Sequence, residues 1–307
     1  MQTDERYKSL KSGKLKAITK IQSEIRRSSG DFLRREGFIE ISPVIISQIT
    51  DPLFHLVDKR EIEYQGKRFK LTHSMIFHKQ IALLVHEKIF AFSPNIRLEP
   101  IEFLDTKRHL IEFTQLDLEV KEAKRRDVIS LGEELLMDVI SSVKNSCKEE
   151  LSVLDRKLKL PSRPFEQTPY QKAYEKCGPD FENILSYLHK EPFWIVDFPK
   201  EMREFYDRED PARPGVLLDM DLVYPEGYGE ALSGGEREHE HKRVSSRIKS
   251  TGLSPENFQP YMEFLEKGLP SSAGFGIGIE RLTRWICGLS GIEETTLFPK
   301  LPGGEGI

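Results

Sequence analysis

The chain has 307 residues, of which 38% are hydrophobic, and this length allows one large α+β or α/β domain or two smaller domains. A formal net charge of −4 provides no general attraction to nucleic acid or to an anionic membrane. The three cysteines form no metal motif or disulfide framework, and the polar start is not a secretory signal, so we expect a cytoplasmic protein. The longest apolar runs, such as residues 81–85, are too short to span a membrane.

The first elements predicted along the chain are a long helix and an edge strand. Apolar residues recur at helical spacing over residues 14–36, and Gly37 ends the pattern. Residues 38–41 resemble a strand, and Pro43, which lacks an N–H, places it at a sheet edge or a break. A long helix that leads into an edge strand can form a dimer interface, and we expect a homodimer. An ordinary amphipathic helix would show the same pattern.

A hairpin and a short helix are predicted next. Residues 61–64 and 69–71 flank Gln65-Gly66, which is a turn signal. Residues 72–80 begin with Thr and Ser, which suit a helix N-cap, and place Lys79 about one turn inside the helix. By itself, a lysine at such a position is more often a solvated surface residue.

The stretch from Lys88 to Val120 predicts a strand, a charged loop and a returning strand. Residues 88–92 are apolar, whereas residues 113–120 alternate, so that one face of the second strand is packed and the other presents Gln115, Asp117 and Glu119. Cations on a sheet surface suit an anion, and arginine suits phosphate because its planar fork donates two parallel hydrogen bonds. The alternative to an anion site is a charged hairpin tip that is solvated and has no function. The charged residues of the loop include Arg97, Glu99, Lys107, Arg108, His109 and Glu112.

The middle of the chain predicts scaffold elements and then a polar segment. We expect a charged helix from residue 127 to about residue 160, a helix over residues 168–177 and a buried central strand over residues 193–197. A strand over residues 216–223 places Asp219 and Asp221 on one face. In the segment that follows, Glu230 and Ser233 are oxygen ligands of the kind that Mg²⁺ accepts when a nucleotide shares it. Alternatively, this segment is a loop before a helix over residues 236–249.

The last informative segment is rich in glycine. Gly274, Gly276 and Gly278 alternate with apolar residues, so a strand here has one face without side chains, on which a flat ligand can lie. Arg281 then opens a helix. The segment contains neither the dinucleotide-binding fingerprint nor a P-loop. The glycine spacing alone could also serve close packing.

Together these segments resemble the catalytic core of class II aminoacyl-tRNA synthetases, in the aspartyl/asparaginyl branch. Residues 14–43 resemble the first signature of the family, which builds its dimer interface. Arg97-Leu98-Glu99 with the run from Arg108 to Phe113 resembles the second, and residues 274–281 resemble the third, which ends in Glu-Arg. Residues 229–237 resemble a stretch of this branch, and the likeness extends from about residue 14 to residue 299. The fold it implies is α+β: a mostly antiparallel sheet flanked by helices.

The resemblance also implies roles for individual residues. Arg97 would hold the α-phosphate of ATP, Glu99 and Phe113 would contact adenine, and His109 and Arg281 would lie near the other phosphates. Glu230 and Ser233 would hold Mg²⁺. We assign the catalytic role to Arg97 and Arg281, which would stabilise charge at the α-phosphorus. Further expected nucleotide contacts are Arg108, Gly276 and Gly278, and the expected amino-acid contacts are Lys79, Ser74, Gln115, Asp117, Arg237 and Gly235.

Two features narrow the expected function. We expect one catalytic domain over residues 1–307 without the N-terminal OB-fold that reads the anticodon in this branch, so tRNA is not an expected partner. Lys79 stands where the aspartyl branch carries lysine, and with Arg237 it indicates aspartate as the substrate. The usual Gln-Ser-Pro-Gln before this lysine is replaced by His73-Ser74-Met75-Ile76, a departure that touches the amino-acid pocket.

These features resemble the archaeal asparagine synthetases related to asparaginyl-tRNA synthetase. The implied reaction converts aspartate, ammonia and ATP through β-aspartyl-adenylate into asparagine, AMP and pyrophosphate. One alternative is a truncated synthetase-like enzyme that aminoacylates a tRNA or protein acceptor. Another is an inactive paralogue that serves as a regulatory subunit.

Overall fold

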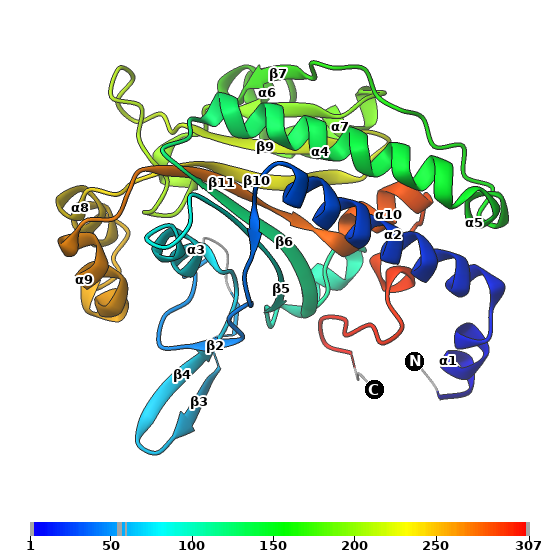
Figure 1. Cartoon of the computed structure of the whole chain (residues 1–307), viewed down its shortest axis with the longest axis horizontal. Coiled ribbons are helices and arrows are strands. Elements are labelled where there is room, and N and C mark those ends of the chain that lie inside the picture. Colours follow the sequence, from blue (N-terminus) through cyan, green and yellow to red (C-terminus); the bar gives the residue numbers. More distant parts are fainter. Residues whose placement is uncertain (1–2, 54–56, 59, 305–307) are drawn as a thin grey trace.

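One mixed sheet of eight strands organises the molecule (Figure 1). The computed structural model describes residues 3–53, 57–58 and 60–304. Neighbouring strands are antiparallel except for the outer pairs β1–β5 and β7–β8, which are parallel. The predicted α+β fold is therefore confirmed. In spatial order the strands are β1 (Ile39–Glu40), β5 (Lys88–Ile96), β6 (Glu112–Lys121), β11 (Ser272–Gly278), β10 (Gly229–Arg237), β9 (Asp219–Tyr224), β8 (Phe193–Val196) and β7 (Glu166–Pro169).

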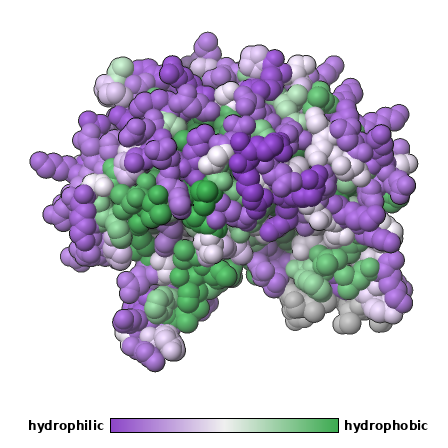
Figure 2. Space-filling view, in the orientation of Figure 1, coloured by the Kyte–Doolittle hydropathy of each residue, from purple (hydrophilic) through white to green (hydrophobic). Residues whose placement is uncertain are grey.

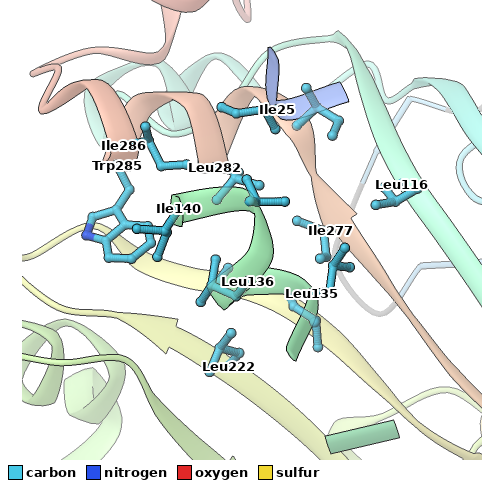
Figure 3. Packing of buried hydrophobic residues seen from close by; sticks show 14 of the residues in the cluster. Ile25, Leu116, Leu135, Leu136, Ile140, Leu222, Ile277, Leu282, Trp285 and Ile286 are labelled. Carbon is cyan, nitrogen blue, oxygen red and sulfur yellow. The ribbon is translucent and has the colours of Figure 1, made fainter. Parts of the chain in front are cut away.

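Three helices bury one face of this sheet. They are α2 (Gly13–Arg35), α4 (Arg125–Ser146) and α10 (Ile279–Cys287). Each has an apolar stripe at helical spacing, and the stripes meet alternate residues of the strands, such as Leu116, Leu222 and Ile277 (Figure 3). This cluster is the main core, and it fixes which strand residues point away from it. Two more helices, α1 (Thr3–Leu10) and α5 (Lys148–Val153), flank α2 and α4.

The opposite face is covered only at its sides. At one side, α6 (Tyr170–Cys177) and α7 (Phe181–Leu188) pack against Phe193, Ile195 and Val223. At the other end, Phe77 of α3 (Ile76–Ala82) packs with α8 (His241–Ser250) and α9 (Gln259–Lys267). Between them, the face of β6, β11 and β10 that points away from the main core carries polar side chains and glycines. This uncovered part of the sheet is where a ligand can bind.

A small second sheet projects beside α3. It contains β2 (Ile46–Ser47) and the predicted hairpin, which is confirmed as β3 (Glu61–Tyr64) and β4 (Lys67–Leu71). Among the helices that the structure describes, none combines the length and apolar character needed to cross a bilayer.

Several predicted elements differ from the observed ones. The helix predicted to reach residue 160 breaks at Cys147 and ends at Val153. The helix predicted from residue 168 begins at Tyr170, because residues 166–169 form β7. The strand at 193–197 is buried but lies second from the sheet edge rather than at its centre. Residues 229–237 form a strand, so the alternative of a loop is wrong, and the helix considered from residue 236 begins at His241.

Candidate active site

A cleft lies on the uncovered face of the sheet. It consists of a cavity of about 390 Å³, here called the inner cavity, and an adjoining cavity of about 60 Å³, here called the side cavity. Arg97, Glu230 and Arg281 are among the residues that line both, so the two spaces are continuous. Segments far apart in the sequence therefore meet at one site, as the sequence predicted.

The floor of the cleft is a row of residues on neighbouring strands. Asp117 on β6 lies opposite Gly276 on β11, Gly276 lies opposite Ser233 on β10, and Ser233 lies opposite Asp221 on β9. Phe275 and Ile277, on the other face of β11, belong to the main core. A Cβ atom on Gly276 would lie 2.9 Å from the side-chain nitrogen of Gln115, so any larger residue would fill this floor. The predicted bare face of the glycine strand is present.

A β-bulge brings Glu230 and Ser233 to the same face. In a regular strand, residues three apart point to opposite faces. The register of β10 against β9 shifts between Glu230 and Leu232, so the extra residue Ala231 restores both side chains to the cleft. Burial opposes ionisation of Glu230, but Arg281, Arg108 and more distant arginines lower its pKa below the usual value, so this carboxylate is negative at neutral pH.

These two oxygen ligands fit a magnesium ion that is shared with phosphate. Mg²⁺ takes about six oxygen ligands and is usually held by one or two protein groups plus phosphates and water. Among the described residues, no group of three or more acidic, histidine or cysteine side chains could hold a metal ion by itself. A carboxylate and a hydroxyl that face the same cavity match the shared arrangement.

Two arginines bring positive charge to the cleft. Arg97 follows β5, donates from Nε to the backbone oxygen of His73 at 3.0 Å, and places its guanidinium 5.2 Å from the ring centre of Phe113. Arg281, in the first turn of α10, lies 3.3 Å from a carboxylate oxygen of Glu230. Both side chains line the inner cavity and leave donors for an anion such as phosphate.

The side cavity contains the other residues predicted to bind the nucleotide. Glu99, Arg108, His109, Phe113 and Gly278 line it. Arg108 pairs with Glu182 at 2.8 Å, which ties the loop between β5 and β6 to α7. Phe113 offers an aromatic face beside the glycine strand, a surface that suits a planar base.

The opposite end of the inner cavity contains buried charges of both signs. Lys79 has its Nζ atom 3.1 Å from Asp117 and 3.4 Å from Glu119, and its side chain is only 4% exposed. The alternative that Lys79 is a solvated surface residue is therefore wrong. Arg237 pairs with Glu119 at 3.2 Å and with Asp207 at 2.9 Å. This mixture of signs suits an amino acid, which brings an ammonium group and at least one carboxylate.

One predicted contact residue does not line the cleft, and several lining residues were missed. Gly235 packs so closely on Asp219 that an added Cβ would lie 2.7 Å from the Asp219 Cα, which indicates a role in strand packing. Ser74, Gln115, Asp117 and the other assigned residues do line one or both cavities. The missed lining residues include Asp51, Arg203, Glu204, Tyr206 and Asp207, which lie in irregular segments without a periodic pattern.

Glu280 beside the side cavity makes the stability of the fold depend on pH. Its side chain is 9% exposed, and burial raises its pKa from 4.5 to about 7, although Thr114 donates a backbone hydrogen bond to it. The folded protein therefore binds a proton that the unfolded chain has lost between these pH values, so stability falls as the pH rises through this range.

We expect Glu280→Gln, which keeps the acceptor for Thr114, to remove this loss. Relative to the wild type, the variant should gain up to about 3 kcal/mol in free energy of unfolding between pH 4.5 and pH 8. Urea unfolding of both proteins across this range measures the difference. A difference that stays constant with pH would contradict the assignment.

The comparisons with known proteins place this cleft in a family. The family model described as tRNA synthetases class II (D, K and N) matches residues 1–302. The chain belongs to this family. Its members are ATP-dependent ligases.

Solved structures agree in fold. Asparaginyl-tRNA synthetase from Pyrococcus horikoshii, complexed with asparaginyl-adenylate, is 27% identical with a TM-score of 0.90, over 98% of this chain and 72% of that one. The aspartyl-tRNA synthetase from Entamoeba histolytica is 26% identical with a TM-score of 0.80, over 99% and 62%. Asparaginyl-tRNA synthetase from the same organism, at 24% identity, shares the fold with a TM-score of 0.85, over 96% and 70%.

Proposed function

We propose that this synthetase-family protein activates aspartate with ATP and transfers the aspartyl group to ammonia, which yields asparagine. The observation that carries the proposal is the inner cavity. It combines Arg97 and Arg281 for phosphate with the buried cations Lys79 and Arg237 beside carboxylates, within one continuous space. An amino acid with an additional carboxylate finds partners there for each of its charges.

The proposed reaction has two steps. A carboxylate oxygen of aspartate attacks the α-phosphorus of ATP, the bond to the next phosphate breaks, and pyrophosphate leaves. Arg97 and Arg281 would neutralise the charge that builds on the α-phosphoryl oxygens. Glu230 and Ser233 would hold Mg²⁺, which shields the triphosphate charge when it is bound. The nitrogen of ammonia then attacks the carbonyl carbon of the adenylate, the bond to the phosphate oxygen breaks, and AMP leaves.

A product assay without tRNA tests the proposal. The purified protein receives ATP, Mg²⁺, aspartate and ¹⁵N-labelled ammonium, and mass spectrometry follows labelled asparagine while AMP is quantified. We expect equal amounts of both products. Asparagine and its α-amide isomer are separated by chromatography, which shows which carboxylate is activated.

Control reactions separate the alternatives. Replacing aspartate by asparagine tests for the activation that an asparaginyl-tRNA synthetase performs. Aspartate-dependent pyrophosphate exchange without a labelled product would favour transfer to a tRNA or protein acceptor. Absence of ATP binding in calorimetry would favour an inactive regulatory subunit.

We also propose that the protein forms a homodimer through the edge of the sheet at β1. Ile39 of β1 is 45% exposed, and Ile45 and Ile46, a few residues further along the chain, are 51% and 48% exposed. Figure 2 shows hydrophobic residues gathered where β2 meets the hairpin. An open strand edge next to apolar side chains favours pairing with another chain. Light scattering at micromolar concentration should give twice the mass of one chain, and the mass of one chain would refute the proposal.

A further inference from the structure

A third space, here called the outer cavity, adjoins the inner cavity. Its volume is about 1040 Å³, and it lies between residues 200–214 and α8. Leu53, Arg203 and Glu204 line both the inner and the outer cavity, so they form the partition between them. None of the residues assigned to ATP, Mg²⁺ or aspartate lines the outer cavity. It offers a second approach to the reacting centre, separate from the nucleotide side.

The position of Glu204 at this partition is fixed by its backbone and by the residue next to it. Its backbone oxygen accepts a hydrogen bond from Arg247 at 2.8 Å, and the next residue, Phe205, is buried and stacked on Phe77. Within the described part of the chain, the hydrogen bond that engages the Glu204 carboxylate comes from its own backbone N–H, and no ion pair to another residue is formed. The adjacent Arg203 does not satisfy it, because Arg203 pairs with Asp219 at 3.0 Å and Asp221 at 2.5 Å.

A second unsatisfied acceptor lies on the wall of the inner cavity. Asp117 is 3% exposed, and its Oδ2 atom has no hydrogen-bond partner among the described residues. A buried carboxylate oxygen without a donor is costly, so such an atom indicates a ligand that brings N–H groups. Ammonium is a small cation with four N–H donors, and the carboxylates of Glu204, Asp207 and Asp117 all line the inner cavity.

We propose that ammonium reaches the site through the outer cavity, binds the carboxylate of Glu204 and gives its proton to that carboxylate before the nitrogen attacks the adenylate. This inference rests on the proposed function. It adds the residue that receives the nitrogen substrate and the side from which this substrate arrives.

The surroundings of Glu204 suit a proton acceptor. Burial and the nearby carboxylates of Asp51 and Asp207 raise the pKa of Glu204, against the opposing effect of Arg203. Because its pKa is raised, Glu204 is protonated in part of the molecules at neutral pH, and the ionised remainder is a stronger base than an ordinary carboxylate and lies closer to ammonium in proton affinity. A cation that binds there also relieves the repulsion among the three carboxylates.

The proton balance of the step is complete. Ammonium loses one proton to Glu204, and the lone pair that this frees forms the C–N bond. When the tetrahedral carbon collapses, AMP leaves with the electrons of the C–O bond, and the nitrogen passes a second proton to the phosphate oxygen of the departing AMP to become the amide. Glu204 can return its proton to solvent through the outer cavity, so it is ready for the next cycle.

Glu204→Gln tests the inference because it removes the base and keeps the shape. We expect kcat/KM for ammonium in asparagine formation to fall about 10²-fold more than aspartate-dependent pyrophosphate exchange, which needs no ammonium. Hydroxylamine is largely uncharged at neutral pH, so it can attack without first giving up a proton. Formation of aspartyl hydroxamate should therefore be retained. Glu204→Asp, which keeps a carboxylate, should recover part of the ammonium activity.

The matched control is Glu201→Gln. Glu201 is exposed and lines the outer cavity but not the inner one, so the same loss of charge should leave the ammonium dependence unchanged. An equal effect in both variants, or an equal loss with ammonium and hydroxylamine in Glu204→Gln, would overturn the inference. If the wild type forms neither asparagine nor hydroxamate, the proposed function fails instead.

Discussion

Arg281→Ala should lower aspartate-dependent exchange of pyrophosphate into ATP by about 10²–10³-fold, the loss that follows removal of one donor to a developing anion. The guanidinium is 23% exposed at the cleft and lies 3.3 Å from Glu230. Without it, the α-phosphoryl oxygens would lose a donor, and Glu230 would lose its closest positive partner. Both effects act on the transition state for adenylate formation.

The same change should leave the fold intact, because the side chain of Arg281 is partly exposed and contributes no apolar core contact. Circular dichroism and urea unfolding check this. Arg281→Lys keeps the charge without the planar fork and should be intermediate. Arg284→Ala is the matched control: it lies one turn further along α10, stacks on Tyr228 at 5.1 Å and lines neither cavity. Exchange at the wild-type rate in Arg281→Ala would remove the phosphate role.

Lys79→Met should destabilise the protein by about 3–5 kcal/mol, the range observed when one partner of a buried ion pair is removed. Its ammonium lies beside Asp117 and Glu119, which are 3% and 0% exposed, and it also donates to the backbone oxygens of Leu118 and Phe275 at 3.3 Å. A methionine of similar length would leave these acceptors buried without a cation.

Urea unfolding of single and double variants measures this coupling. The double variant Lys79→Met/Asp117→Asn has one buried, unpaired carboxylate fewer, so part of the lost stability should be recovered. Lys16→Met, on the exposed side of α2, should change stability by no more than about 0.5 kcal/mol. A loss of that small size in Lys79→Met would show that the buried pair is worth little. Because Lys79→Met is expected to be less stable, its affinity for aspartate must be measured under conditions in which the variant is still folded.

The arrangement of the cleft floor could be predicted from the sequence because it depends on local alternation. Gln115 and Asp117 alternate with core residues in β6, and the glycines of β11 do the same. Each pattern therefore predicts which side chains lie on the same face of the sheet. The resemblance to synthetases then added that these segments meet at one site.

Other parts of the site depend on contacts that no local pattern records. Lys79 follows apolar residues on a short helix, and its burial is explained only by Asp117 and Glu119 on a distant strand. The bulge at Ala231 reverses the expected direction of Ser233 relative to Glu230, and strand periodicity cannot show it. Glu204 and Asp207 lie in an irregular segment, so neither helical nor strand periodicity marks them.

The position of β11 has a consequence for biosynthesis. This strand fills the middle of the sheet between β6 and β10, yet it follows both in the chain. Until the ribosome has made β11, the strand edges of β6 and β10 have unpaired backbone groups, which are exposed to each other and to neighbouring chains. A nucleotide bound at the proposed site would stabilise the protein only after this insertion, because β11 supplies the glycine floor. We therefore expect the nascent chain to depend on chaperones until its last strand is released.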